Sequence, residues 1–134
     1  MALDVDSRAL RRYGVGDVTA IVLFVVLGEL SHGADPLSIL GQMALTTSTF
    51  LFGWVAVAVV SGSYGSGTLT DRRQAVIVPL VGWAFADAIA QALRATEFFP
   101  GNADVTFYVV ALIFGGAVLG SWRYISFSFS QRTS

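Results

Sequence analysis

Four long apolar runs constrain the fold of this chain more than any other feature. They cover about residues 15–33, 38–61, 74–96 and 104–124 and are joined by short connections. A helix needs about 20 mostly apolar residues to cross the hydrocarbon core of a bilayer, and its backbone groups must find hydrogen bonds within the segment. Alternating segments of about ten residues, typical of transmembrane barrels, are absent. We therefore predict an all-α, polytopic membrane protein: one domain over residues 1–134, with four transmembrane helices packed as a bundle.

The composition supports this class and excludes several others. Of the 134 residues, 54% are hydrophobic and 13% are charged, whereas a soluble domain carries roughly 25% charged residues. The chain has no cysteine and a single histidine, which argues against disulfide, zinc-ribbon, iron–sulfur and multi-histidine sites. The net charge of −1 gives no electrostatic footprint for nucleic acid. We expect no metal, no cofactor and no nucleic acid, and the lipid bilayer as the main partner.

The placement of arginine predicts the orientation, because Lys and Arg collect on the cytoplasmic flanks of membrane helices. The first and third connections carry acidic residues and no basic ones, with Arg94 near the outer end of the third run. We therefore predict a cell-membrane protein with both termini in the cytoplasm. The other basic residues lie before the first run, in the second connection and after the last run: Arg8, Arg11, Arg12, Arg72, Arg73, Arg123 and Arg132.

The start of the first apolar run and the end of the last one each predict a local feature. Asp17 and Glu29 interrupt the first run and no small-residue cleavage site follows, so we expect a retained helix and not a secretory signal. Asp17 lies at the start of this run, where a carboxylate would cap a helix or complement its dipole. Trp122, Arg123 and Tyr124 are typical of a cytoplasmic interfacial anchor, and residues 125–134 are expected to form a frayed tail.

Polar groups inside the runs are expensive at membrane depth and need an explanation. Asp87, Gln91 and Arg94 follow i, i+4, i+7 spacing and share one helix face. The inner halves of the second and third runs, such as residues 53–60 and 75–86, are almost free of charge. The sequence thus predicts an outward-facing polar cavity above an apolar plug. Its candidate residues are Glu29, His32, Gln42, Thr46, Thr49, Asp87, Gln91 and Arg94.

Two functions remain open for these residues. They could bind or translocate a small solute, an ion or a proton, as intramembrane carboxylates often do. They could instead hold helices, or a partner membrane protein, together by hydrogen bonds worth about 0.6 kcal/mol each. A chain this small would require a homodimer or larger homo-oligomer to act as a carrier. We expect no enzymatic activity, because no HExxH, Gly-x-Ser-x-Gly or paired-carboxylate pattern is present. Gly116 and Gly120 form a GxxxG pair that predicts close helix packing.

A set of short motifs carries a family resemblance. They are Gly16-Asp17, Phe24, Gly28, Ser31-His32-Gly33, Phe52-Gly53-Trp54 and Trp122-Arg123. With these motifs the chain resembles domain-of-unknown-function family 3054, small four-helix membrane proteins of halophilic archaea and actinobacteria. The resemblance implies a multi-pass membrane location and no assigned activity. Glu29 departs from the family pattern, in which a basic residue often follows the glycine, so no shared role for its carboxylate is implied. The absence of lysine would suit a halophilic host, or a genome of high GC content.

Overall fold

The computed structural model describes residues 5–31, 40–96 and 105–133, without the side chains of residues 29–31, 42, 132 and 133. These residues form the helices α1 (Ser7–Ser31), α2 (Leu40–Ser61), α3 (Arg72–Arg94) and α4 (Val105–Thr133). A short 3₁₀ helix, η1 (Ser66–Leu69), lies between α2 and α3. The prediction of an all-α chain with four helices is confirmed. The described part of the chain contains no strand.

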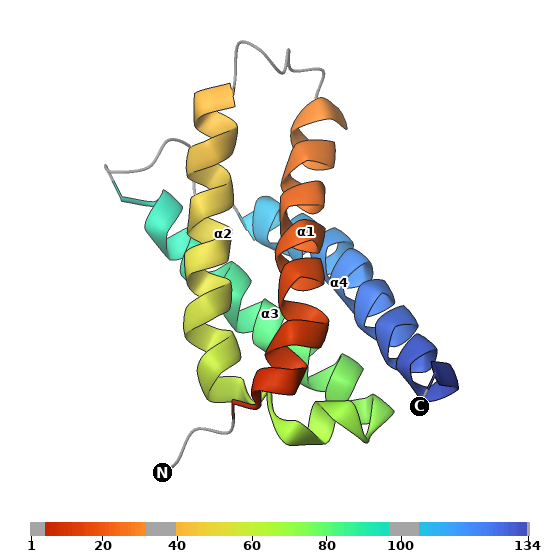
Figure 1. Ribbon diagram of the computed structural model, residues 1–134. Helices are drawn as coiled ribbons and strands as arrows, with labels where there is room; N and C mark the ends of the chain where they lie inside the picture. The colour runs from red at the N-terminus through yellow and green to blue at the C-terminus, as the bar shows by residue number, and fades with distance from the viewer. Residues whose placement is uncertain (1–4, 32–39, 97–104, 134) are drawn as a thin grey trace.

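The helices run alternately up and down. α1 and α2 lie side by side, and α3 and α4 cross behind them at an angle (Figure 1). α3 packs against both α2 and α4, and α1 packs against the same two helices. The first turn of α1 and the last turn of α4 lie at one end of the bundle, together with η1 (Figure 1). α1 therefore begins, and α4 ends, at the same end of the bundle.

α3 can occupy this position because four of its nine buried residues are alanine or glycine. Its buried positions recur at helical spacing and include Ala75, Gly82, Ala86 and Ala90. Small side chains let neighbouring helices approach closely. A Cβ atom added at Gly53 of α2 would lie only 2.6 Å from the backbone oxygen of Ala86. The side chain of Asp71 caps the start of α3 by accepting a hydrogen bond from the Arg73 amide at 2.9 Å.

α1 and α4 are both longer than the apolar runs that predicted them. α1 begins at Ser7, and the Asp6 side chain accepts a hydrogen bond from the Arg8 amide at 2.8 Å. α4 continues to Thr133, so the prediction of a frayed tail is wrong. The reason is tertiary packing, because Phe127 is buried in the core and the Gln131 amide donates a hydrogen bond to the Leu69 carbonyl.

Three of the described helices are long and apolar enough to cross a membrane. The stretches are Met43–Ser61 in α2, Arg72–Arg94 in α3 and Val105–Gln131 in α4, with mean hydropathy of 1.8, 1.7 and 1.8. Large apolar side chains face outward from them, among them Phe52, Phe85 and Phe114. The fourth predicted span, residues 15–33, extends into residues outside the described part of the chain and stays a prediction.

An aromatic layer occupies the middle of the bundle. It consists of Phe24 from α1, Phe50 from α2, Trp83 from α3 and Phe107 from α4. Phe50 stacks on Trp83 with ring centroids 5.5 Å apart, and Phe24 meets both rings edge-on. The Trp83 indole N–H donates a hydrogen bond to the Ala111 carbonyl of α4 at 3.0 Å. One residue from each helix therefore fixes the packing at this level.

Candidate functional site

The polar residues predicted to share a face of the third helix are buried inside the bundle. Asp87, Gln91 and Arg94 of α3 are each at most 8% exposed, and Thr46 and Thr49 of α2 are at most 3% exposed. We call these five residues the α3 cluster. The contact of Gly53 with Ala86 sets the register of the antiparallel helices α2 and α3. With a rise of about 1.5 Å per residue, Thr49 and Thr46 lie at the levels of the last turns of α3.

Part of the α3 cluster is held by contacts within its own helices. The Gln91 amide donates a hydrogen bond to Asp87 Oδ1 at 3.2 Å, one turn away. The Thr49 hydroxyl donates to the Thr46 carbonyl at 2.7 Å. The Arg94 guanidinium lies over the Phe107 ring of α4, 4.2 Å from its centroid, which is a cation–π contact. The cluster therefore lies on α2 and α3 and contacts α4 through Phe107.

Several oxygen atoms of the α3 cluster have no hydrogen-bond partner in the described part of the chain. They are Asp87 Oδ2, Gln91 Oε1 and Thr46 Oγ1, and each is buried. A buried polar atom without a partner costs about 1–3 kcal/mol, so such atoms usually bind water, an ion or a ligand. All three atoms accept hydrogen bonds. A group that satisfies the Asp87 and Gln91 oxygens must therefore donate hydrogen bonds or carry positive charge, whereas the Thr46 hydroxyl can also donate.

The remaining residues predicted for the site stand apart or lie outside the described structure. His32 is outside the described residues, as are the side chains of Glu29 and Gln42.

Gly116 and Gly120 are buried where α4 meets α3. A Cβ atom at Gly120 would lie 3.2 Å from Leu80 of α3, and one at Gly116 3.7 Å from the same side chain. This GxxxG pair therefore packs within the chain, against α3.

A second polar cluster, which the sequence analysis did not predict, joins α1 to α4. Asp17 and Arg123 form an ion pair in which both side chains are 0% exposed. Arg123 Nε donates to Asp17 Oδ1 at 2.9 Å, and Arg123 Nη2 donates to Asp17 Oδ2 at 2.7 Å. This two-pronged geometry is the strongest arrangement for an arginine and a carboxylate. We call Asp17, Arg123, Tyr13, Ser63 and Tyr64 the ion-pair cluster.

The connection between α2 and α3 completes the ion-pair cluster. Arg123 Nη1 donates to the Ser63 carbonyl at 2.8 Å, and the Tyr64 hydroxyl donates to Asp17 Oδ2 at 2.6 Å. The Tyr13 ring lies 4.2 Å from the guanidinium carbon of Arg123. Burial, and secondly the neighbouring Asp17 carboxylate, raise the pKa of the Tyr64 hydroxyl above its usual range. Tyr64 therefore remains a hydrogen-bond donor at neutral pH.

The ion-pair cluster corrects three expectations from the sequence. Asp17 does not cap a helix, because α1 begins at Ser7 and continues through it. Arg123 is not an interfacial anchor, because it is fully buried against Asp17. The half of the bundle beneath the aromatic layer is not an apolar plug, since it contains this ion pair. The signal in the sequence was one acidic and one basic residue, both predicted near the cytoplasmic ends of apolar runs.

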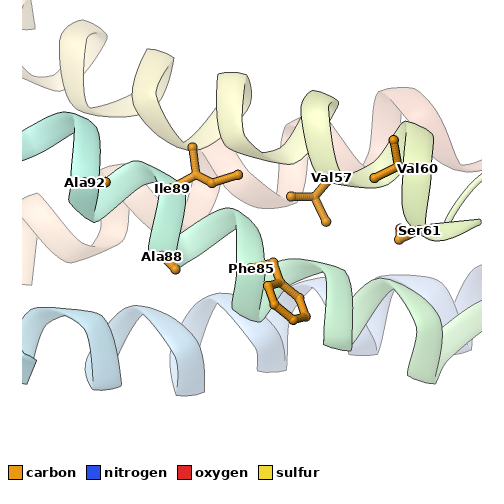
Figure 2. A pocket seen from close by; sticks show the side chains of 7 residues that line it. All are labelled: Val57, Val60, Ser61, Phe85, Ala88, Ile89 and Ala92. Carbon is orange, nitrogen blue, oxygen red and sulfur yellow. The ribbon is translucent and has the colours of Figure 1, made fainter.

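A groove of about 520 Å³ lies between α2 and α3 on the outside of the bundle. Val57 of α2 and Ile89 of α3 point into the space between these helices (Figure 2). The other lining residues are Val60, Ser61, Phe85, Ala88 and Ala92. No residue of either polar cluster lines this groove. The groove is therefore separate from the candidate site, and its apolar walls suit lipid chains.

The fold and its buried polar groups define a small all-α protein in which three of the described helices are long and apolar enough to span a membrane. The chain belongs to the family described as Protein of unknown function (DUF3054), whose model matches residues 14–126. The family resemblance read from the short motifs is thereby confirmed. The matched range contains Asp17, Arg123 and all of α3. No curated protein and no solved structure matches the chain.

Proposed function

We propose that the protein is a multi-pass protein of the cell membrane, with four spans and both termini in the cytoplasm. In this proposal the α3 cluster binds, or carries across the membrane, a small polar solute, an ion or a proton. The observation that supports it most is the set of buried acceptor oxygens, Asp87 Oδ2, Gln91 Oε1 and Thr46 Oγ1, that have no partner in the described residues.

The contrast between the two clusters supports this assignment. In the ion-pair cluster both carboxylate oxygens of Asp17 accept hydrogen bonds from Arg123, and Oδ2 also accepts one from Tyr64. In the α3 cluster Asp87 receives one hydrogen bond from the described residues, donated by Gln91 to Oδ1. Polar groups that serve only to hold helices together gain most when fully paired. The α3 cluster therefore has capacity for a ligand that the ion-pair cluster lacks.

The chemistry of these oxygens narrows the ligand class. Carboxylate, amide and hydroxyl oxygens bind hard cations and groups that donate hydrogen bonds. The Arg94 guanidinium brings positive charge to the same helix face, about one turn beyond Gln91 and two turns beyond Asp87, which favours a ligand of low charge. Passage across the bundle would also require movement of Phe24, Phe50 and Trp83, because these rings pack together at its middle.

A thermal-shift series on detergent-purified protein tests the proposal. Unfolding is followed over a range of pH and with a panel of monovalent cations, ammonium and small solutes, for the wild type, Asp87→Asn and Gln91→Leu. A ligand that binds the folded state raises the melting temperature with its concentration. We expect a pH- or cation-dependent increase in the wild type that is lost in Asp87→Asn.

The matched control is Tyr64→Phe, which removes two buried hydrogen bonds, one donated to Asp17 and one accepted from Trp54, and leaves the α3 cluster intact. It should lower the melting temperature but keep the ligand-dependent increase. If no ligand or pH dependence occurs in any variant and Asp87→Asn is simply less stable, the binding function is wrong. That result would favour a structural or accessory membrane subunit, whose polar groups hold helices or a partner protein together.

A further inference from the structure

Arginine residues gather at the end of the bundle that holds the first turn of α1 and η1. Three of them, Arg8, Arg11 and Arg12, lie on the first turns of α1, and Arg72 and Arg73 begin α3. Two contacts hold the start of α1 against the connection that leads into α3. The Asp6 amide donates to the Tyr64 carbonyl at 2.7 Å, and the Tyr13 hydroxyl donates to the Thr68 carbonyl at 2.8 Å. All five arginines are exposed.

Most of this positive charge is not neutralised by the protein itself. Arg8 is paired with Asp6 at 2.9 Å, and this hydrogen bond holds the pKa of Asp6 below its usual value. Asp71 is engaged in capping α3. Arg11, Arg12 and Arg73 form no ion pair with any described residue. The end of the bundle therefore presents an excess of guanidinium groups to its surroundings.

Apolar and aromatic side chains border these arginines. Arg72 lies 5.2 Å from the ring centroid of Tyr124 and 5.9 Å from that of Phe127. Val15, one turn after Arg11 and Arg12, is 80% exposed, and Phe129 near the end of α4 is 66% exposed. A surface on which guanidinium groups adjoin exposed apolar side chains matches a phospholipid, whose phosphate and acyl chains are joined in one molecule.

We propose that this arginine-rich end binds the phosphate headgroups of anionic phospholipids, with Arg11, Arg12 and Arg73 as its principal contacts. The proposal rests on the membrane location proposed above. Guanidinium groups form paired hydrogen bonds with phosphate oxygens. Each basic residue near an anionic membrane surface adds about five-fold to the affinity for it. The apolar neighbours Val15 and Phe129 would contact the upper parts of the acyl chains.

Quenching of tryptophan fluorescence by brominated lipids tests this assignment. The protein is reconstituted in bilayers that contain brominated phosphatidylglycerol or brominated phosphatidylcholine at equal fractions, and the ratio of quenching gives the relative affinity for the two lipids. We expect a preference of at least several-fold for the anionic lipid in the wild type. It should be lost in Arg11→Gln/Arg12→Gln/Arg73→Gln and retained in the charge-preserving control Arg11→Lys/Arg12→Lys/Arg73→Lys.

The possible results separate this proposal from the one it rests on. Quenching by neither lipid would show that the chain is not in the bilayer, and both proposals would fail. Equal quenching by the two lipids in the wild type would place the chain in the bilayer but overturn the anionic-lipid site. A preference that persists in the glutamine variant would also overturn it, because the arginines would then not be its source. Stabilisation by inorganic phosphate without any lipid preference would assign the arginines to a free anion instead.

Discussion

Breaking the buried ion pair between Asp17 and Arg123 should be among the most destabilising single changes available in this protein. In Arg123→Met the guanidinium disappears while the aliphatic part of the side chain is kept. Asp17 then remains fully buried and charged, loses both guanidinium hydrogen bonds and keeps the one from the Tyr64 hydroxyl. An uncompensated buried charge of this kind costs about 3–5 kcal/mol.

The contacts of Arg123 support this magnitude. It donates two hydrogen bonds to the Asp17 carboxylate and one to the Ser63 carbonyl, and hydrogen bonds to charged groups contribute about 1.5–3 kcal/mol each. The cation–π contact with Tyr13 is lost as well. The substitution also removes the unfavourable cost of burying the Arg123 guanidinium. The total loss is therefore smaller than the sum of these contributions. A loss of about 3–5 kcal/mol is a large part of the roughly 5–15 kcal/mol by which a typical domain is stable.

The double variant Asp17→Leu/Arg123→Met makes the reasoning testable even if the single variant folds poorly. With both charges removed, no buried charge is left unpaired, and stability should recover by several kcal/mol relative to Arg123→Met. Unfolding in mixed micelles, followed by circular dichroism, gives the free energies. A loss of less than about 1 kcal/mol in Arg123→Met, or simple additivity of the two substitutions, would contradict a buried ion pair of this strength.

Three further predictions follow from packing and protonation. Gly53→Ala should destabilise by about 1–3 kcal/mol, because the new Cβ would lie 2.6 Å from the Ala86 backbone oxygen, whereas Gly41→Ala meets no atom within 4 Å and should leave the melting temperature unchanged or slightly higher. Trp83→Phe should lose about 1–3 kcal/mol in the same assay, since Ala111 loses its indole donor; a loss below about 0.5 kcal/mol would contradict this. The raised pKa of Tyr64 means that its contribution to stability is complete below its unfolded pKa of about 10 and is lost as pH rises above it. The stability difference between wild type and Tyr64→Phe, measured from neutral pH upward, should therefore shrink above pH of about 10, and a constant difference would argue against a buried neutral phenol.

The helices themselves could be predicted from the sequence because helix formation depends on residues close together in the chain. Long apolar runs and helical spacing predict four helices, and the spacing of Asp87, Gln91 and Arg94 places them on one face. The structure has these residues on one helix and buried. The ends of the helices could not be predicted in this way. Asp6 and Gln131 are held by contacts with the connection between α2 and α3, far away in the sequence.

The buried polar residues also divide into a part that the sequence predicts and a part that only the structure shows. That Asp87 needs a compensating environment follows from its place in an apolar run, and this is true whatever surrounds the helix. That Asp17 is paired with Arg123 depends on how α1 packs against α4, across 106 positions of sequence. The prediction that Asp17 caps a helix used only residues near it in the sequence, so it could not identify Arg123 as its partner.

The sequence by itself determined the class of fold, the placement of apolar surfaces and the excess of arginine at one end of the bundle, because these properties depend on composition and on the period of the helix. Only the tertiary structure decided which polar groups are satisfied. Hydrogen bonds act over about 3 Å, so they depend on the packing of helices that lie far apart in the chain. That packing pairs Asp17 completely and leaves Asp87 Oδ2 without a donor among the described residues.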